Sequence, residues 1–311
     1  MPRLPRPARS LLRRLPTLAL VLTTTTAVAL PVRAEGVVQR VARSGELVIG
    51  APTDLPPLVF RDSAGTWTGY AVDVGRVIAA ELSGALGRPV QLRIEPTDDP
   101  RGLVEGVAKG DLNLVCGMPF TWSADGVVDF SLPIAISGLR LMAPAGRLDG
   151  SPASLKGRRI GVVRDSLAAT ELGGIQPEAR AVEFVDLGAA LKDLQAGRID
   201  GVIGDSTLLV GLARTRGLSN LVLTPDQPYE TYSVACMLPE NDSQFRNLVN
   251  LAIARWMQAY VDGDPRAVKT VHRWVGPGGM RELPADQLRA VFESVLSTVE
   301  ALRPVPPAAA R

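Results

Sequence analysis

Two spacings of apolar residues alternate along the chain. Short apolar runs bounded by glycine or polar residues, such as residues 46–50, predict β-strands. Between these runs, apolar residues recur three or four positions apart, as Val74, Ile78 and Leu82 do before the helix-ending Gly87, and predict helices. Strands that alternate with helices are typical of α/β folds with mostly parallel sheets. The predicted strands are 46–50, 90–94, 112–116, 159–163, 181–185 and 202–203, and the predicted helices are 72–86, 101–109, 166–172, 189–196 and 208–215.

The same order of elements begins again near residue 159, and two stretches match across this restart. Residues 103–117 and 191–204 each contain the end of a helix, a glycine, a short apolar strand and a second glycine. We therefore predict two lobes of similar topology rather than a repeat array, whose units are much shorter. A cleft between two such lobes, beyond the carboxyl ends of the strands, is the default site for a small molecule. The strand ends are residues 51–58, 116–124, 164–168 and 204–207.

The first 34 residues have the order of a secretory signal peptide. Five arginines precede a mostly apolar stretch at 15–30, and Val32 and Ala34 are the small residues expected before a cleavage point after Ala34. The alternative is an uncleaved anchor, but four threonines interrupt the stretch, which falls short of the ~20 apolar residues of a spanning helix. We expect an exported, periplasmic chain with no stable membrane anchor after cleavage.

The net charge changes once this leader is set aside. Of the 34 basic residues, six lie in the first 34 positions and none of the 32 acidic residues does, which leaves a net charge of −4. No basic surface for nucleic acid is indicated. The rest of the 311 residues suffices for one large domain or two of ordinary size.

Candidate catalytic and metal-binding residues are few. The only histidine, His272, lies beside Trp274 and is expected to pack at the surface. Two cysteines and one histidine cannot form a usual zinc site, and the chain has no Gly-x-Ser-x-Gly nucleophile motif. The sequence therefore predicts no catalytic residue, no metal and no cofactor.

Five short motifs stand in a characteristic order along the chain, and together they resemble family 3 of the bacterial extracellular solute-binding proteins. These proteins are periplasmic receptors that deliver amino acids and related solutes to ABC importers. The sequence is also similar, at residues 120–122 and 128–134, to an orphan subset found beside radical-SAM peptide-maturation genes, without an importer component. The five motifs are GAPTDLPP at 50–57, GYAVD at 69–73, VDFSLP at 128–133, LKGRRIGV at 155–162 and LQAGRID at 194–200.

The resemblance implies a type II periplasmic binding protein fold, α/β in class and two-lobed. Each lobe would hold a mixed, mostly parallel sheet flanked by helices, and two crossover strands near 136–141 and 232–235 would form a hinge. A monomer would close around a small-molecule or peptide ligand. If the chain is a transport receptor, the membrane component of an ABC importer would be its partner. Exported dehydratases on the same fold are the enzyme alternative. Lobe 1 would comprise 46–137 and 236–275, lobe 2 would comprise 138–235, and residues 276–311 would add a helix and a Pro/Ala-rich tail.

Four positions of the implied ligand site keep a polar residue. Asp205 stands where the family has an acid for the ligand's amino group, although an Asp there also suits the N-cap of the following helix. Ser166 lies at a helix start that would meet a carboxylate. Thr121 lies in the segment that carries family threonines, and Asp54 lies in the first strand-end loop.

Four other positions depart from the family pattern. The arginine that pairs with an α-carboxylate is replaced by Ala124, and the aromatic residue that stacks on the ligand is replaced by Leu55. Polar residues at the end of the third strand are replaced by Cys116 and Gly117. The resemblance therefore implies a site that is poorly suited to ordinary free amino acids.

Three residues are candidates to replace what is missing. Trp122 would supply a stacking ring, or it packs over Pro119. Arg101 and Arg140 would supply the cation, although Arg140 alternates with leucines and suits the solvent face of a hinge strand equally well.

Two features remain open. Cys116 and Cys236 are either a disulfide or two buried thiols, since spacing alone does not decide, and the type II topology would place them on neighbouring antiparallel strands. Apolar residues at helical spacing within 284–302 predict a last helix that either packs on lobe 1 or docks a partner.

Overall fold

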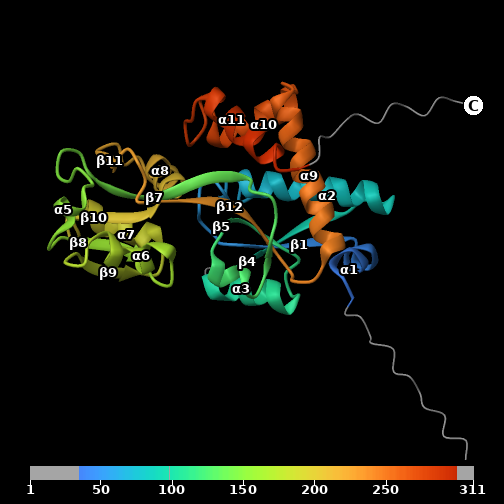
Figure 1. Ribbon diagram of the computed structural model, residues 1–311, viewed down its shortest axis with the longest axis horizontal. Helices are drawn as coiled ribbons and strands as arrows, with labels where there is room; N and C mark the ends of the chain where they lie inside the picture. Colours follow the sequence, from blue (N-terminus) through green and yellow to red (C-terminus); the bar gives the residue numbers. More distant parts are fainter. Residues whose placement is uncertain (1–34, 98, 300–311) are drawn as a thin grey trace, which may run out of the picture. The chain divides into compact units, whose positions relative to one another are not determined.

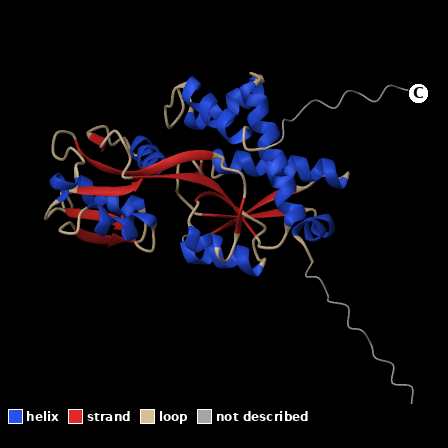
Figure 2. Cartoon of the chain, in the orientation of Figure 1, coloured by secondary structure: helices blue, strands red, loops and turns tan. Residues whose placement is uncertain are grey.

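The computed structural model describes residues 35–97 and 99–299. The predicted signal peptide and the Pro/Ala-rich tail lie outside these residues. Strands and helices alternate as predicted, which confirms the α/β class, and Figure 2 shows the strands flanked by helices. The helices are α1 (Val37–Ser44), α2 (Tyr70–Leu86), α3 (Pro100–Lys109), α4 (Trp122–Asp125), α5 (Pro152–Leu155), α6 (Leu167–Ile175), α7 (Leu187–Gln195), α8 (Ser206–Thr215), α9 (Ser243–Val261), α10 (Pro265–Val275) and α11 (Ala285–Leu296). The strands are β1 (Glu46–Ala51), β2 (Phe60–Arg61), β3 (Trp67–Thr68), β4 (Gln91–Pro96), β5 (Val115–Pro119), β6 (Asp129–Phe130), β7 (Ala135–Pro144), β8 (Arg159–Val163), β9 (Arg180–Phe184), β10 (Gly201–Asp205), β11 (Leu221–Thr224) and β12 (Glu230–Leu238).

Two long strands connect the halves of the fold. The main sheet has the order β5-β12-β7-β10-β8-β9, and β7 pairs with β12 in antiparallel register, Ala135 opposite Val234. The parallel pair β1–β4 joins this sheet through a bridge between Ile49 and Leu114. Figure 1 shows β7 and β12 passing together from one lobe to the other, as expected of the two hinge strands.

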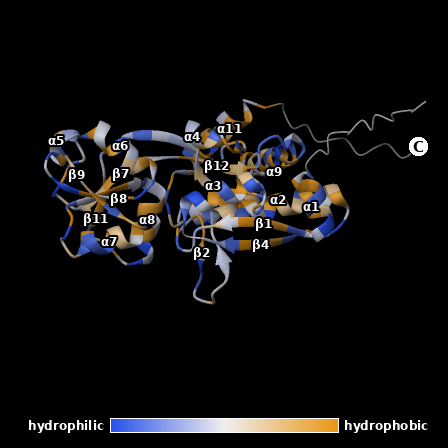
Figure 3. Ribbon diagram, turned by 90° about the horizontal axis from the view of Figure 1, so that it is seen from below, coloured by the Kyte–Doolittle hydropathy of each residue, from blue (hydrophilic) through white to orange (hydrophobic). Residues whose placement is uncertain are grey.

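The buried apolar residues form separate cores on either side of the hinge strands. The largest core draws on residues 37–134 and 234–295, and two smaller cores draw on residues 139–218. Figure 3 shows hydrophobic and hydrophilic residues mixed along the helices, as expected of helices that bury one face. The separate cores support the proposed division of the chain into two lobes.

The third strand is displaced from its predicted position. Residues 112–116 are apolar except for Asn113, but β5 runs from Val115 to Pro119. Leu112 and Asn113 instead hydrogen-bond to Gly106 and Val48 in the turn that follows α3. Cys116 therefore begins this strand rather than ending it at the cleft, which corrects the expected position.

The last helix packs on the first lobe, so one of its two predicted alternatives is observed. Leu288 and Phe292 of α11 belong to the large core, and Phe292 packs against Tyr260 with ring centroids 5.0 Å apart. Trp256 of α9 lies 5.8 Å from the same Phe292 ring. Residues 276–283, between α10 and α11, thereby come to lie beside the hinge strands.

The two cysteines are joined. Cys116 of β5 and Cys236 of β12 face each other in antiparallel register, next to a bulge at Ala235, and form a disulfide. No other cysteine occurs in the sequence. The bridge fastens β5 of the first lobe to β12, the strand that returns from the second lobe.

Candidate functional site

A cavity of about 360 Å³ lies between the hinge strands, the start of α8 and the segment that contains α11. This volume is at the lower end of the roughly 300–1,000 Å³ typical of small-molecule sites. Residues from both lobes line it, because α8 belongs to the second lobe whereas α11 packs on the first. Its polar wall includes Ser137, Arg140, Asp205, Thr207 and Arg281, and its apolar wall includes Leu58, Val234, Leu288, Val291 and Phe292.

One glycine brings two wall residues into place at the start of α2. Gly69 has a φ of +130°, and a Cβ added there would lie 2.2 Å from the Leu58 carbonyl oxygen. The amides of Tyr70 and Ala71 donate to the carbonyls of Pro57 and Leu58, so the loop lies directly on the helix start. This contact requires glycine, because any side chain would collide with the loop backbone.

Arg140 reaches the cavity from β7. Its Nε donates to the Pro225 carbonyl at 2.6 Å, and one terminal nitrogen donates to the Leu223 carbonyl at 3.1 Å. The side chain is only 13 % exposed, while the nearest acid, Asp226, is 3.8 Å away and fully exposed. Burial lowers the pKa of the Arg140 guanidinium, while the charges of Asp226 and Tyr229 act in the opposite direction. Arg140 is therefore a cation of the site rather than a solvent-facing residue of its strand.

Asp205 caps α8, as one of its two predicted roles requires. One carboxylate oxygen caps α8 by accepting from the amides of Thr207 at 2.8 Å and Leu208 at 3.0 Å. The other oxygen accepts from the Tyr232 hydroxyl at 2.7 Å. Asp205 also lines the cavity. Its carboxylate is thus already engaged in three hydrogen bonds before any ligand arrives.

Arg281 is a site residue that sequence reasoning missed. Its amide donates to the Trp274 carbonyl at 2.8 Å, which fixes the segment, and its side chain lines the cavity. The Nε atom is buried and has no hydrogen-bond partner among the described residues. Burial, and then the charge of Arg140, lower the pKa of this guanidinium, whereas Asp205 acts in the opposite direction. No family motif extends to position 281, so no sequence signal marked it.

Two predicted ligand residues form ion pairs across the lobes instead of lining the cavity. Asp54 lies 3.1 Å from Arg216, at the end of α8. Arg101, at the start of α3, lies 2.7 Å from Asp165 in the loop after β8. Arg101 is therefore not the replacement cation in this structure.

The remaining predicted residues lie at strand and helix ends outside the cavity. Ser166 caps α6 through the Ala169 amide and donates to the Val163 carbonyl. Thr121 caps the short helix α4. Leu55 closes a turn through Val59, and Gly117, with φ +88°, lies beside Leu58.

Trp122 and Ala124 occupy the two faces of α4. Trp122 is 81 % exposed and meets only the edge of Phe120 at a centroid distance of 5.0 Å, so it lies neither over Pro119 nor in the cavity. Ala124 packs against the apolar cluster around Leu103 and Val128. The position of the family arginine therefore contributes no charge.

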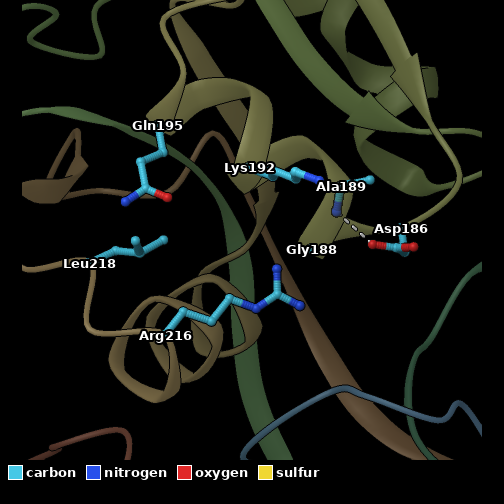
Figure 4. Close-up of a pocket in the computed structure, with 7 residues that line it drawn as sticks. All are labelled: Asp186, Gly188, Ala189, Lys192, Gln195, Arg216 and Leu218. Carbon is cyan, nitrogen blue, oxygen red and sulfur yellow. Dashed lines mark hydrogen bonds between the residues drawn. The ribbon is translucent and has the colours of Figure 1, made fainter.

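A second cavity of about 370 Å³ lies on the second lobe, between α7 and the end of α8. Figure 4 shows Arg216 pointing toward Gly188, with Asp186 turned back to cap α7 at Ala189. The cations at its edge are Lys192 and Arg216, and Arg216 already pairs with Asp54. This cavity lies away from both hinge strands and is the weaker candidate.

Other chemistry is sparse in the described part of the chain. His272 hydrogen-bonds to Tyr260 at 3.1 Å and packs edge-on against its ring. Within residues 35–97 and 99–299, no group of three His, Cys, Asp or Glu side chains could hold a metal ion. None of the helices described is both long and apolar enough to cross a membrane.

Two buried tyrosines predict a loss of stability in alkali. Burial raises the pKa of Tyr70, and burial together with Asp205 raises that of Tyr232. The folded protein keeps both protons above pH 10, where the unfolded chain begins to release them. Stability should therefore be constant below about pH 10 and should fall above it by about 1.4 kcal/mol per pH unit for each tyrosine.

Urea unfolding between pH 8 and 11.5 measures this slope. The variant Tyr232→Phe should lose one tyrosine's share of it. Tyr260→Phe should change the slope less, because the charge of Arg289 opposes the rise that burial causes in the pKa of Tyr260. Equal slopes in the unaltered protein and in Tyr232→Phe would contradict the prediction.

Comparison with known proteins agrees with this fold. The family model of the bacterial extracellular solute-binding proteins, family 3, matches residues 47–262. A glutamate/aspartate import solute-binding protein of Salmonella typhimurium is 24 % identical over 269 residues, covering 82 % of this chain and 86 % of that protein. The L-cystine-binding protein of Escherichia coli (strain K12) is 23 % identical over 249 residues, covering 78 % of this chain and 87 % of that protein.

Solved structures are similar in fold. An ancestral arginine-binding protein bound to glutamine has a TM-score of 0.64 at 22 % identity and covers 75 % of this chain and 98 % of its own. An ancestral amino acid-binding protein, a precursor of cyclohexadienyl dehydratase, has a TM-score of 0.65 at 20 % identity, covering 78 % of this chain and 100 % of its own. The family match ends at residue 262, before α10 and α11.

Proposed function

Because the chain belongs to family 3 of the bacterial extracellular solute-binding proteins, we propose that it is an exported receptor that closes two lobes around one small polar solute. The family consists of binding proteins, so the chain is not assigned an enzymatic role. The observation that carries the proposal is the cavity at the hinge, because it joins Arg140 and Asp205 of the second lobe to apolar residues of the first. A ligand there would contact both lobes at once, as a closing receptor requires.

The proposed location is the periplasm. The basic start, the apolar stretch and the small residues Val32 and Ala34 support export with cleavage after Ala34. Mass spectrometry of the mature protein would then find Glu35 as its first residue.

The ligand is proposed to be a small solute handed to an ABC importer. The cavity volume of about 360 Å³ suits a compact molecule better than an extended peptide. The names of the relatives, a glutamate/aspartate import protein and an L-cystine-binding protein, describe ligands of that size. The alternative is an orphan adapter that binds a peptide or modified peptide. Neighbouring permease and ATPase genes would favour the receptor, and peptide-maturation genes would favour the adapter.

Two ion pairs and one packing contact join the lobes in this closed arrangement, and closure of an open form must make them. Asp54–Arg216 and Arg101–Asp165 cross from one lobe to the other. Helix α8 also packs directly on the loop of the first lobe, since a Cβ at Gly211 would lie 2.1 Å from the Pro56 carbonyl oxygen. Exposed ion pairs contribute only about 0–1 kcal/mol each, so a ligand can control this closure.

We predict that ligand binding reduces the radius of gyration, because the free protein can break these weak contacts and open at the hinge. Small-angle X-ray scattering with and without saturating ligand measures the change. The double variant Asp54→Asn and Arg101→Gln should be more open without ligand and should still close with it. An unchanged profile at saturation would indicate a fixed cleft and would favour the adapter.

The most direct test identifies the ligand. Native mass spectrometry of the gently purified protein should show one co-purifying small molecule, and calorimetry should then measure its return to the emptied protein. The variant Thr207→Val, which changes the cavity wall, should weaken binding, whereas Thr215→Val at the far end of α8 should not. A protein that neither carries nor binds any solute would refute the proposal.

A further inference from the structure

Two arginine side chains meet at the hinge cavity without an acid that neutralises both. Arg140 enters from β7, and Arg281 enters from the segment between α10 and α11. Asp226 reaches Arg140 only at 3.8 Å and is fully exposed to solvent. Asp205 lines the same cavity as the two arginines, but its carboxylate oxygens already accept hydrogen bonds from two amides and a tyrosine hydroxyl. Arg281 is thus left without an ion-pair partner among the described residues.

The position of Arg281 is imposed by the backbone around it. Its amide is held by the Trp274 carbonyl, and the preceding carbonyls of Gly279 and Met280 accept from Arg214 of α8. These hydrogen bonds connect the segment to α10 on one side and to α8 of the second lobe on the other, and they hold residue 281 beside the hinge. The Nε atom is left buried and without a partner among the described residues. A buried donor without a partner is costly, so an acceptor from outside the chain is the natural completion of this site.

We propose that Arg140 and Arg281 form a binding site for a small organic monocarboxylate whose apolar body lies against α11. The proposal rests on the proposed receptor function and names the class of its ligand. Two carboxylates also line the cavity, but Asp226 is exposed and lies 3.8 Å from Arg140, and the oxygens of Asp205 are already engaged. Arg281 therefore has no ion pair among the described residues, and a monoanion would supply its partner. Arginine suits this role because its planar fork donates two parallel hydrogen bonds to a carboxylate.

The opposite wall of the cavity determines which chemical groups the ligand can carry besides its carboxylate. Val291 and Phe292 of α11, with Leu58 and Val234, present an apolar surface to the same cavity. An α-ammonium group would lie among two guanidinium groups. Of the two acids in the lining, Asp205 offers it only an oxygen already in use, and Asp226 is exposed beside Arg140. The site therefore favours carboxylates that lack an ammonium group. It differs from the family's amino-acid site, whose arginine position is Ala124 in this chain.

Matched probes test the charge requirement. 3-Phenylpropionate, phenylalanine and 3-phenylpropanamide share one apolar body and differ only in charged groups, and hexanoate and benzoate vary the body. Calorimetry on the full mature protein, stripped of ligand, should show the best of the three carboxylates binding at least tenfold more tightly than phenylalanine and the amide. The affinity should fall with rising salt, since the attraction is electrostatic.

One arginine variant and a matched control test the role of Arg281 in carboxylate binding. Arg281→Gln should weaken carboxylate binding by about 30-fold or more, the effect expected when one partner of a buried charge pair is removed. Arg266→Gln is the matched control, because Arg266 is exposed on α10 and lies outside the cavity. The ligand-free Arg281→Gln protein should melt no lower than the unaltered protein, because the change removes an unpaired buried donor. Lost binding in a protein of equal stability is a result that misfolding would not give.

The outcomes separate the two proposals. Equal carboxylate binding by Arg281→Gln and the unaltered protein would overturn the anion site, as would the absence of binding by every carboxylate at 1 mM (roughly −4 kcal/mol). If the co-purifying solute is neutral or cationic and binds both proteins equally, the anion site is wrong while the receptor function stands. A carboxylate found in the native protein and lost from Arg281→Gln would support both.

Discussion

Removing the disulfide should destabilise the protein by about 4–5 kcal/mol. Cys116 and Cys236 are 120 residues apart, and a cross-link that closes a loop of this size restricts the unfolded chain strongly on the chain-entropy model. Both residues are buried between β5 and β12, so reduction would also leave two thiols in a core built for a bridge. Urea unfolding of the oxidised protein, and of the double variant Cys116→Ala and Cys236→Ala, measures the difference.

Two controls accompany this measurement. Thiol titration of the unfolded, unreduced protein should find no free sulfhydryl, because the sequence contains only these two cysteines. A reducing agent should lower the stability of the unaltered protein and leave that of the double variant unchanged. Two free sulfhydryls, or equal stability of the two proteins, would show that the bridge is absent or without effect.

Free α-amino acids should bind with dissociation constants of about 30 μM or weaker, roughly 30-fold above a micromolar affinity. The resemblance places the arginine that pairs with the α-carboxylate at Ala124, and this alanine packs into an apolar cluster. Loss of one side of a buried charge pair costs roughly 2–5 kcal/mol, which moves a micromolar affinity to about 30 μM or into the millimolar range. Arg101 does not compensate, because it is exposed and paired with Asp165.

Calorimetry against the twenty amino acids tests this expectation. A bona fide amino-acid receptor of the family, measured in parallel, shows that the assay detects tight binding. A dissociation constant of about 1 μM or below for any amino acid would refute the prediction. Arg140→Gln and Arg281→Gln would then show which guanidinium holds the carboxylate.

The sequence predicted most of the fold because periodicity reports local structure. The strand 159–163 was predicted at its observed bounds, and helices such as α2 and α8 differ by two residues at their starts. The bounds of the third strand were predicted wrongly, because contacts with distant parts of the chain determine where it begins. Leu112, Asn113 and Leu114 lie in a turn beside β1, and the strand begins only where β12 offers a partner.

The site was less predictable, because family motifs describe where residues usually act. Arg140 and Asp205 line the hinge cavity, but Asp54 and Arg101 lie in ion pairs between the lobes and Trp122 points to solvent. Arg281 could not be found by motif, since it belongs to a segment beyond the family match. Its place depends on α11 packing on α9, which a helical pattern permits but does not specify.

The Cys116–Cys236 bridge has a topological consequence. The chain enters the second lobe through β7 and leaves it through β12, and both strands lie within the segment that the bridge closes. The whole second lobe is therefore part of a covalent ring, fastened at its neck. A protease that cuts any single bond between residues 116 and 236 opens the ring without releasing a fragment, so the two halves of the receptor stay attached until the disulfide is reduced.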